Sequence, residues 1–92
     1  MRWTMNITFN ESFAIDPEDP FGVVFEANAD GSKIRIRVSG EALQDISPID
    51  RRNSSKSQFQ ANRFILEEIA IKLIEEGNAA SGILHIQSKH VR

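Results

Sequence analysis

Apolar and polar residues alternate along the first forty positions, and this alternation predicts strands. Between Trp3 and Phe9 every second residue is apolar, as in a strand that buries one face. The next segment, 10–20, contains two prolines, and we expect it to form a loop because proline removes a backbone donor.

A β-hairpin is predicted around Asp30-Gly31, which separates "FGVVFEANA" from "SKIRIRVS". Asp-Gly is typical of a tight hairpin turn in which both central residues have positive φ. With these two residues in the turn, Phe25 lies opposite Ile36, and apolar partners share one face along the whole hairpin. A shift of one residue would destroy this match.

A short helix is expected after the hairpin, over "GEALQDI". Ser39 precedes it and offers the side-chain oxygen that caps a helix N-terminus. Its apolar stripe consists of Ala42, Leu43 and Ile46. We expect this stripe to pack at the edge of the sheet.

Residues 47–57 allow two interpretations. One long helix begins near Pro48, or a turn at 53–55 is followed by a helix that starts at Ser57. We favour the second interpretation because residues 53–58 carry no apolar stripe.

The segment 58–78 predicts a long amphipathic helix. At 100° per residue one face collects six apolar residues, with Ile65 at its edge, and Gly77 supplies the C-terminal stop. The six are Phe59, Leu66, Ile69, Ala70, Leu73 and Ile74.

A last strand is predicted over "GILHIQSKHV" with Ile83, Leu84 and Ile86 buried. Together the elements predict an α+β domain with the order β-β-β-α-α-β, in which a small antiparallel β-sheet is packed on one face by the long amphipathic helix. The length of 92 residues fits a single domain, 1–92.

Two large apolar residues of the main helix, Phe64 and Ile71, lie one heptad apart on the face opposite to the buried one. Two explanations stay open. The segment 10–20, with Phe13 and Ile15, folds over and covers them, or they dock against another chain, which is a second copy or a different protein.

Five basic residues form two clusters that are candidates for contact with an anion. They are Lys33, Arg35, Arg37, Arg51 and Arg52. The net charge of −2 disfavours a polyanionic partner such as nucleic acid, and no aromatic residue stands among the strand arginines to stack on bases. We interpret the strand row as the solvated face of the hairpin, where Glu26 lies opposite Arg35.

Candidate chemistry is sparse. The chain has no cysteine, which excludes disulfides, thiolate metal sites and cysteine nucleophiles. His85 and His90 have no serine or metal-ligand partner at a diagnostic spacing. We therefore expect a protein that is not an enzyme and that has no catalytic residue, cofactor or metal.

The hydropathy pattern predicts a cytoplasmic protein without membrane contact. No apolar run approaches the roughly 20 residues that cross a bilayer, and the N-terminus alternates where a signal peptide would be continuously apolar.

Four segments are similar to one family: "MNITF" at 5–9, "VVFEANADGSKIRIRVSGEAL" at 23–43, "FQANRFILEEIA" at 59–70 and "GILHI" at 82–86. With them the chain resembles the short bacterial proteins grouped as domain of unknown function 1488. The resemblance implies a small α+β fold, a bacterial cytoplasmic setting and no known cofactor. It leaves 1–4 as an N-terminal extension.

The resemblance also marks Ser39, Asn62 and Arg63 as motif positions without giving them a role. We expect Asn62 and Arg63 to anchor the helix to the sheet or to the 47–57 segment. Members of the family often carry a cysteine where Ile36 stands here, so no function that depends on a thiol can be transferred.

The resulting functional hypothesis is a non-catalytic protein-interaction or regulatory accessory module that forms a homodimer or binds an unidentified protein through Phe64 and Ile71. The alternative is a weak nucleic-acid or anionic-ligand binder that uses the Lys33/Arg35/Arg37 strand face and the Arg51-Arg52 loop.

Overall fold

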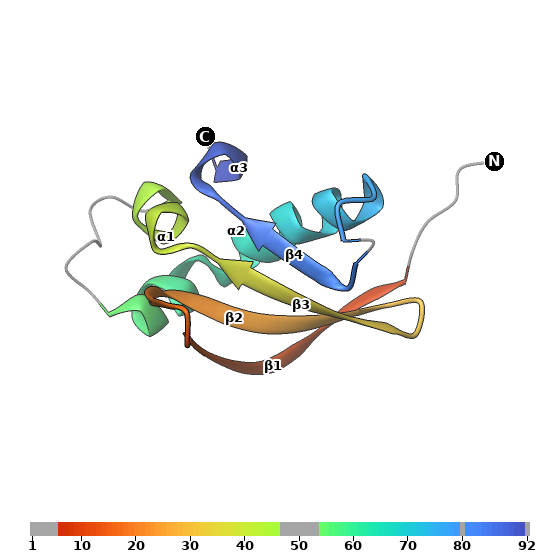
Figure 1. The fold of residues 1–92 in the computed structure, drawn as a ribbon, viewed down its shortest axis with the longest axis horizontal. Coiled ribbons are helices and arrows are strands. Elements are labelled where there is room, and N and C mark those ends of the chain that lie inside the picture. Colours follow the sequence, from red (N-terminus) through yellow and green to blue (C-terminus); the bar gives the residue numbers. More distant parts are fainter. Residues whose placement is uncertain (1–5, 47–53, 80, 92) are drawn as a thin grey trace.

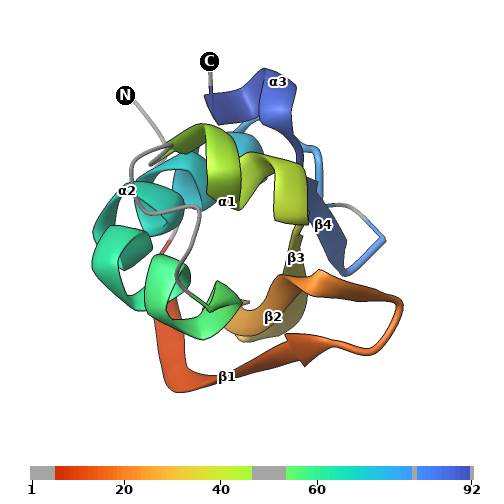
Figure 2. The same cartoon turned by 90° about the vertical axis from the view of Figure 1, so that its left-hand side faces the viewer.

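The computed structural model describes residues 6–46, 54–79 and 81–91. A four-stranded sheet with the order β1-β2-β3-β4 forms one layer, and helices α1 and α2 lie on one of its faces (Figures 1 and 2). The elements are β1 (Ile7–Asp16), β2 (Asp19–Ala29), β3 (Ser32–Val38), α1 (Gly40–Ile46), α2 (Ser55–Glu75), β4 (Ile83–Ile86) and α3 (Ser88–Val91).

The α+β class and the predicted element order are confirmed, with α3 as an added C-terminal turn of helix. The sheet is mixed, however, whereas an antiparallel sheet was expected. Strand β4 runs parallel to β3, because the chain returns through α1 and α2 before it pairs.

The β2–β3 hairpin has the predicted register, with Phe25 opposite Ile36 and Glu26 opposite Arg35. Asp30 and Gly31 have φ values of 51° and 88°, which fit the tight turn. The apolar partners face the helices, and they form the largest part of the core.

The prediction of a loop over 10–20 is wrong, because most of this segment belongs to the β1–β2 hairpin. The sequence hides the strand because its register slips between Phe9 and Phe13, so the simple alternation breaks there. Pro17 lies in the turn, and Pro20 lies in a second irregularity of the pairing, so neither proline interrupts a regular ladder.

Serine side chains cap both described longer helices. Ser39 Oγ accepts a hydrogen bond from the Ala42 N–H at 3.1 Å, as predicted for α1. Helix α2 begins at Ser55, capped by Ser54, so the expected start at Ser57 is wrong; the alternative start near Pro48 lies outside the described residues. The predicted stop is confirmed: Gly77 has a φ of 87°.

The predicted buried face of α2 is confirmed. Five of its six residues are buried, Ile69 packs partly against the core, and Ile65 is 45% exposed at the edge. Phe59 joins the helix to the strands, because its ring contacts those of Phe13 and Phe25 at centroid distances of 4.7 and 5.0 Å.

Arg63 joins α2 to the irregular part of β1. Its guanidinium donates to the backbone carbonyl oxygens of Asn10 and Glu11, the latter at 2.9 Å, and its Nε donates to Glu67 at 2.9 Å. The same group lies 5.4 Å from the centre of the Phe59 ring. Arg63 thus satisfies carbonyl groups where β1 departs from its regular pairing.

Replacing Arg63 with Met should lower the free energy of unfolding by about 2 kcal/mol, because the side-chain stem stays while the charged donors to two carbonyl groups are lost. Urea unfolding followed by circular dichroism measures this change. Lys56→Met, at an exposed position of the same helix, is the control and should change stability little. Equal stability of Arg63→Met and the wild type would show that the contact contributes nothing.

Candidate functional site

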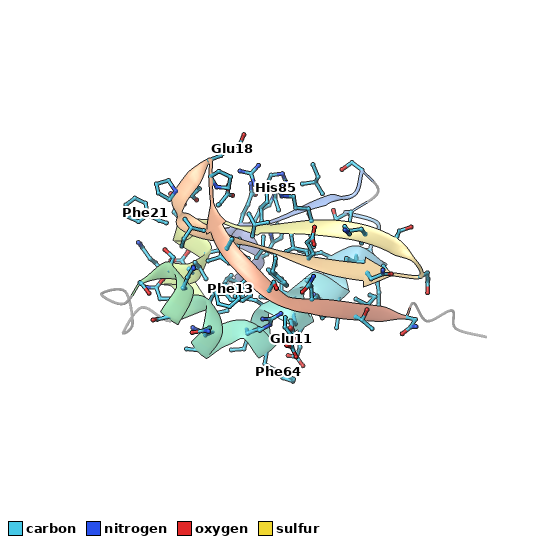
Figure 3. All side chains as sticks on the ribbon, turned by 90° about the horizontal axis from the view of Figure 1, so that it is seen from below. Glu11, Phe13, Glu18, Phe21, Phe64 and His85 are labelled. Carbon is cyan, nitrogen blue, oxygen red and sulfur yellow. The ribbon has the colours of Figure 1, made fainter. Side chains whose placement is uncertain are left out.

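Phe64 lies on the surface of α2 with 72% of its area exposed, and Figure 3 shows it pointing away from the rest of the molecule. The explanation that segment 10–20 covers Phe64 is therefore wrong. Phe13 turns inward against Phe59 instead, since the slip in β1 places it opposite Phe25 on the core side. Ile71 is half-buried, so Phe64 is more accessible to a partner than Ile71 is.

The strand arginines do not form a uniform basic row. Arg37 donates to Asp16 through Nε and Nη2, at 2.8 and 3.1 Å, and its Nη2 lies 2.6 Å from a Glu18 oxygen. Its charge is therefore balanced within the protein. Lys33 and Arg35 are exposed, while Arg51 and Arg52 lie outside the described residues.

Asp16 is the charged residue that the sequence reasoning missed. It is only 4% exposed, and besides Arg37 it accepts a hydrogen bond from the Glu18 N–H at 2.9 Å. The hydrogen bonds from Arg37 hold the pKa of Asp16 below its ordinary value, although burial acts in the opposite direction. Asp16 thus fixes the tip of the β1–β2 hairpin above the uncovered face of the sheet.

The neighbouring Asp19 fastens the same tip to α1. Its Oδ2 accepts from the Gly40 N–H at 3.0 Å, and its Oδ1 accepts from the Phe21 N–H at 3.1 Å. Asp16 and Asp19 of the "DPED" turn therefore both have structural partners, which explains their position without a ligand.

The histidines and Ser39 form no catalytic arrangement among the described residues. His85 is exposed on β4, and Ser39 Oγ caps α1. His90 Nδ1 accepts from the Gln87 N–H at 2.9 Å, and burial lowers the pKa of His90. In the described ranges no group of His, Asp and Glu side chains fits a metal ion.

The two motif residues of α2 act differently. Arg63 anchors the helix to the sheet, as predicted. Asn62 donates to the Gln58 carbonyl at 2.9 Å within its own helix. This hydrogen bond does not reach the sheet or the 47–57 segment, so the expectation for Asn62 is wrong.

None of the helices in the described part of the chain is long and apolar enough to cross a membrane.

The Asp16–Arg37 pair predicts a pH dependence of stability. Because the pKa of Asp16 is lowered on folding, its contribution is fully present above the pKa of an unfolded aspartate and is lost as the pH falls through the folded value. Asp16→Asn should melt at a lower temperature than the wild type at pH 7, and this difference should shrink below about pH 4.

Thermal melts of both proteins between neutral and acidic pH measure this difference. Glu18→Gln, at an exposed partner of the same arginine, is the control and should change little, because exposed ion pairs contribute little. A difference between Asp16→Asn and the wild type that stays constant through pH 3 would contradict the assignment.

Comparison with known proteins gives a family without an assigned role. The model described as "Protein of unknown function (DUF1488)" matches residues 7–86. A crystal structure of a protein of unknown function from this family, from Shewanella loihica PV-4, is similar with a TM-score of 0.71 and 28% identity, over 87% of this chain and 90% of that chain. No curated protein matches the sequence. Since the family model spans most of the chain, the protein belongs to the DUF1488 family.

Proposed function

We propose that this protein is a non-catalytic interaction module whose partner is a second copy of the same chain. The observation that carries the proposal is Phe64, a large aromatic side chain left 72% exposed on a helix whose opposite face is buried in the core. Aromatic residues in this position are typical anchors of protein interfaces, because they bury a large apolar area at low entropic cost.

The proposed contact surface, called the α2 outer face below, consists of Ala61, Phe64, Ile65, Glu68 and Ile71. These residues follow the three- and four-residue spacing of helices that dock through one face. The first four are exposed and Ile71 is half-buried. The face thus combines apolar anchors with a polar margin.

Its charge pattern favours an antiparallel pair of α2 helices. Glu68 lies in the second half of the face, and Glu75 follows one helical turn beyond Ile71. A twofold axis near Leu66 would place Ile71 opposite the partner's Ala61, and Phe64 opposite the partner's Glu68. The same axis would place Glu75 opposite the partner's Ser57, an uncharged residue of the first turn. In a parallel pair each glutamate would instead oppose its own copy.

The nucleic-acid alternative has less support. Arg37 is already paired with Asp16 and Glu18, so only two cations of the predicted strand row, Lys33 and Arg35, are left for phosphate contacts. A surface that binds the phosphate backbone of a nucleic acid gains affinity with each phosphate that it neutralises. We therefore place the interaction on the helix.

Phe64→Glu should abolish self-association, because it introduces two buried like charges at the centre of the contact. Size-exclusion chromatography with light scattering over a wide concentration range measures the mass. The wild type should approach twice the monomer mass as concentration rises. Phe64→Glu should stay monomeric, and its melting temperature should equal that of the wild type at the low concentrations where both are monomers.

Phe21→Glu is the matched control, since Phe21 is 67% exposed and lies on another part of the molecule (Figure 3). It should dimerise like the wild type. A wild type that stays monomeric throughout, or a Phe64→Glu variant that dimerises normally, would overturn the proposal.

A further inference from the structure

The face of the sheet opposite the helices carries two adjoining hollows. Figure 2 shows the helices on one side of the curved sheet only. The hollows have volumes of about 480 and 500 Å³, and both are lined by Pro17 and Arg35. Volumes in this range accommodate small molecules.

The first of these, called the Arg35 hollow below, has a mostly apolar lining. Ala14 and Val24 are cross-strand partners on the face away from the helices, and Pro17 contributes from the hairpin turn. Glu26 and Arg35 are the charged residues among those that line it. An apolar lining with few polar groups is the usual composition of a ligand site.

The two charges of the Arg35 hollow do not neutralise each other. Glu26 and Arg35 are direct partners across β2 and β3, yet no salt bridge joins them among the described residues. The charge of Arg35 acts toward Asp16 and helps to lower its pKa. The hollow therefore presents one cation and one anion that form no salt bridge with each other in the described part of the chain.

The surrounding charges include Lys33, an exposed cation two residues along β3. Arg37, on the far side of Arg35, is balanced by Asp16 and Glu18. A simple anion at Arg35 would meet the negative Glu26, and a simple cation at Glu26 would meet Arg35. A ligand with both charges satisfies both side chains, and a guanidinium binds a carboxylate with two parallel hydrogen bonds.

We propose that the Arg35 hollow binds a small zwitterion with an apolar body, of the class of an apolar α-amino acid. Arg35 holds the carboxylate, Glu26 holds the ammonium group, and the ligand side chain contacts Ala14, Val24 and Pro17. The site is separate from the α2 outer face, so this proposal does not rest on the proposed self-association.

Titration of the ¹⁵N-labelled protein with L-leucine tests the ligand class by NMR. Amide shifts should be concentrated at Ala14, Val24 and Arg35. 4-Methylpentanoate lacks the ammonium group, and 3-methylbutylamine lacks the carboxylate; each should bind at least roughly tenfold more weakly than leucine. Absence of saturable shifts with leucine, or equal binding of either analogue, would overturn the proposal.

Variants test the two assigned side chains. Arg35→Gln and Glu26→Gln should each weaken leucine binding by at least roughly tenfold while the melting temperature stays within a few degrees. Lys33→Gln is the matched control, an exposed cation two residues along the same strand that does not line the Arg35 hollow. It should bind leucine like the wild type. Equal losses in all three variants would mean a non-specific charge effect and would overturn the assignment.

Discussion

The contact between Arg63 and β1 is the constraint on which the arrangement of this protein depends. Strand β1 is at the edge of the sheet, and its register slips in the middle. Arg63 binds the carbonyl oxygens of Asn10 and Glu11 in this irregular part, which leaves fewer acceptors for another strand to pair with. An irregular edge with occupied acceptors resists edge-to-edge association. Self-association through a helix face is therefore more compatible with this structure than strand pairing at the β1 edge.

The same contact explains why Phe64 is exposed. Consecutive residues of a helix point about 100° apart, and Arg63 is directed at β1. The Phe13, Phe25 and Phe59 rings already fill the space beneath the guanidinium. Phe64, one position further along the helix, lies outside this cluster.

Features set by neighbouring residues could be predicted from the sequence, and features set by distant partners could not. The hairpin register follows from Asp30-Gly31, and the α1 cap follows from Ser39, because both depend on local geometry. The burial of Asp16 depends on Arg37, which is 21 positions away. The extension of β1 depends on a bulge that breaks the alternation. The parallel direction of β4 likewise requires knowledge of the crossover through two helices.

The α2 outer face lies in the helical layer and the Arg35 hollow lies on the sheet, and a few contacting residues connect them. Phe64 follows Arg63 in α2, and Arg63 holds the carbonyl of Glu11, two residues before Phe13, which lines the Arg35 hollow. A partner that displaces α2 against β1 would therefore move the wall of the hollow. Coupling requires that the ligand bind one arrangement of β1 more tightly than another. If β1 has a single arrangement, the two sites act independently, because equal affinity for all states shifts no population.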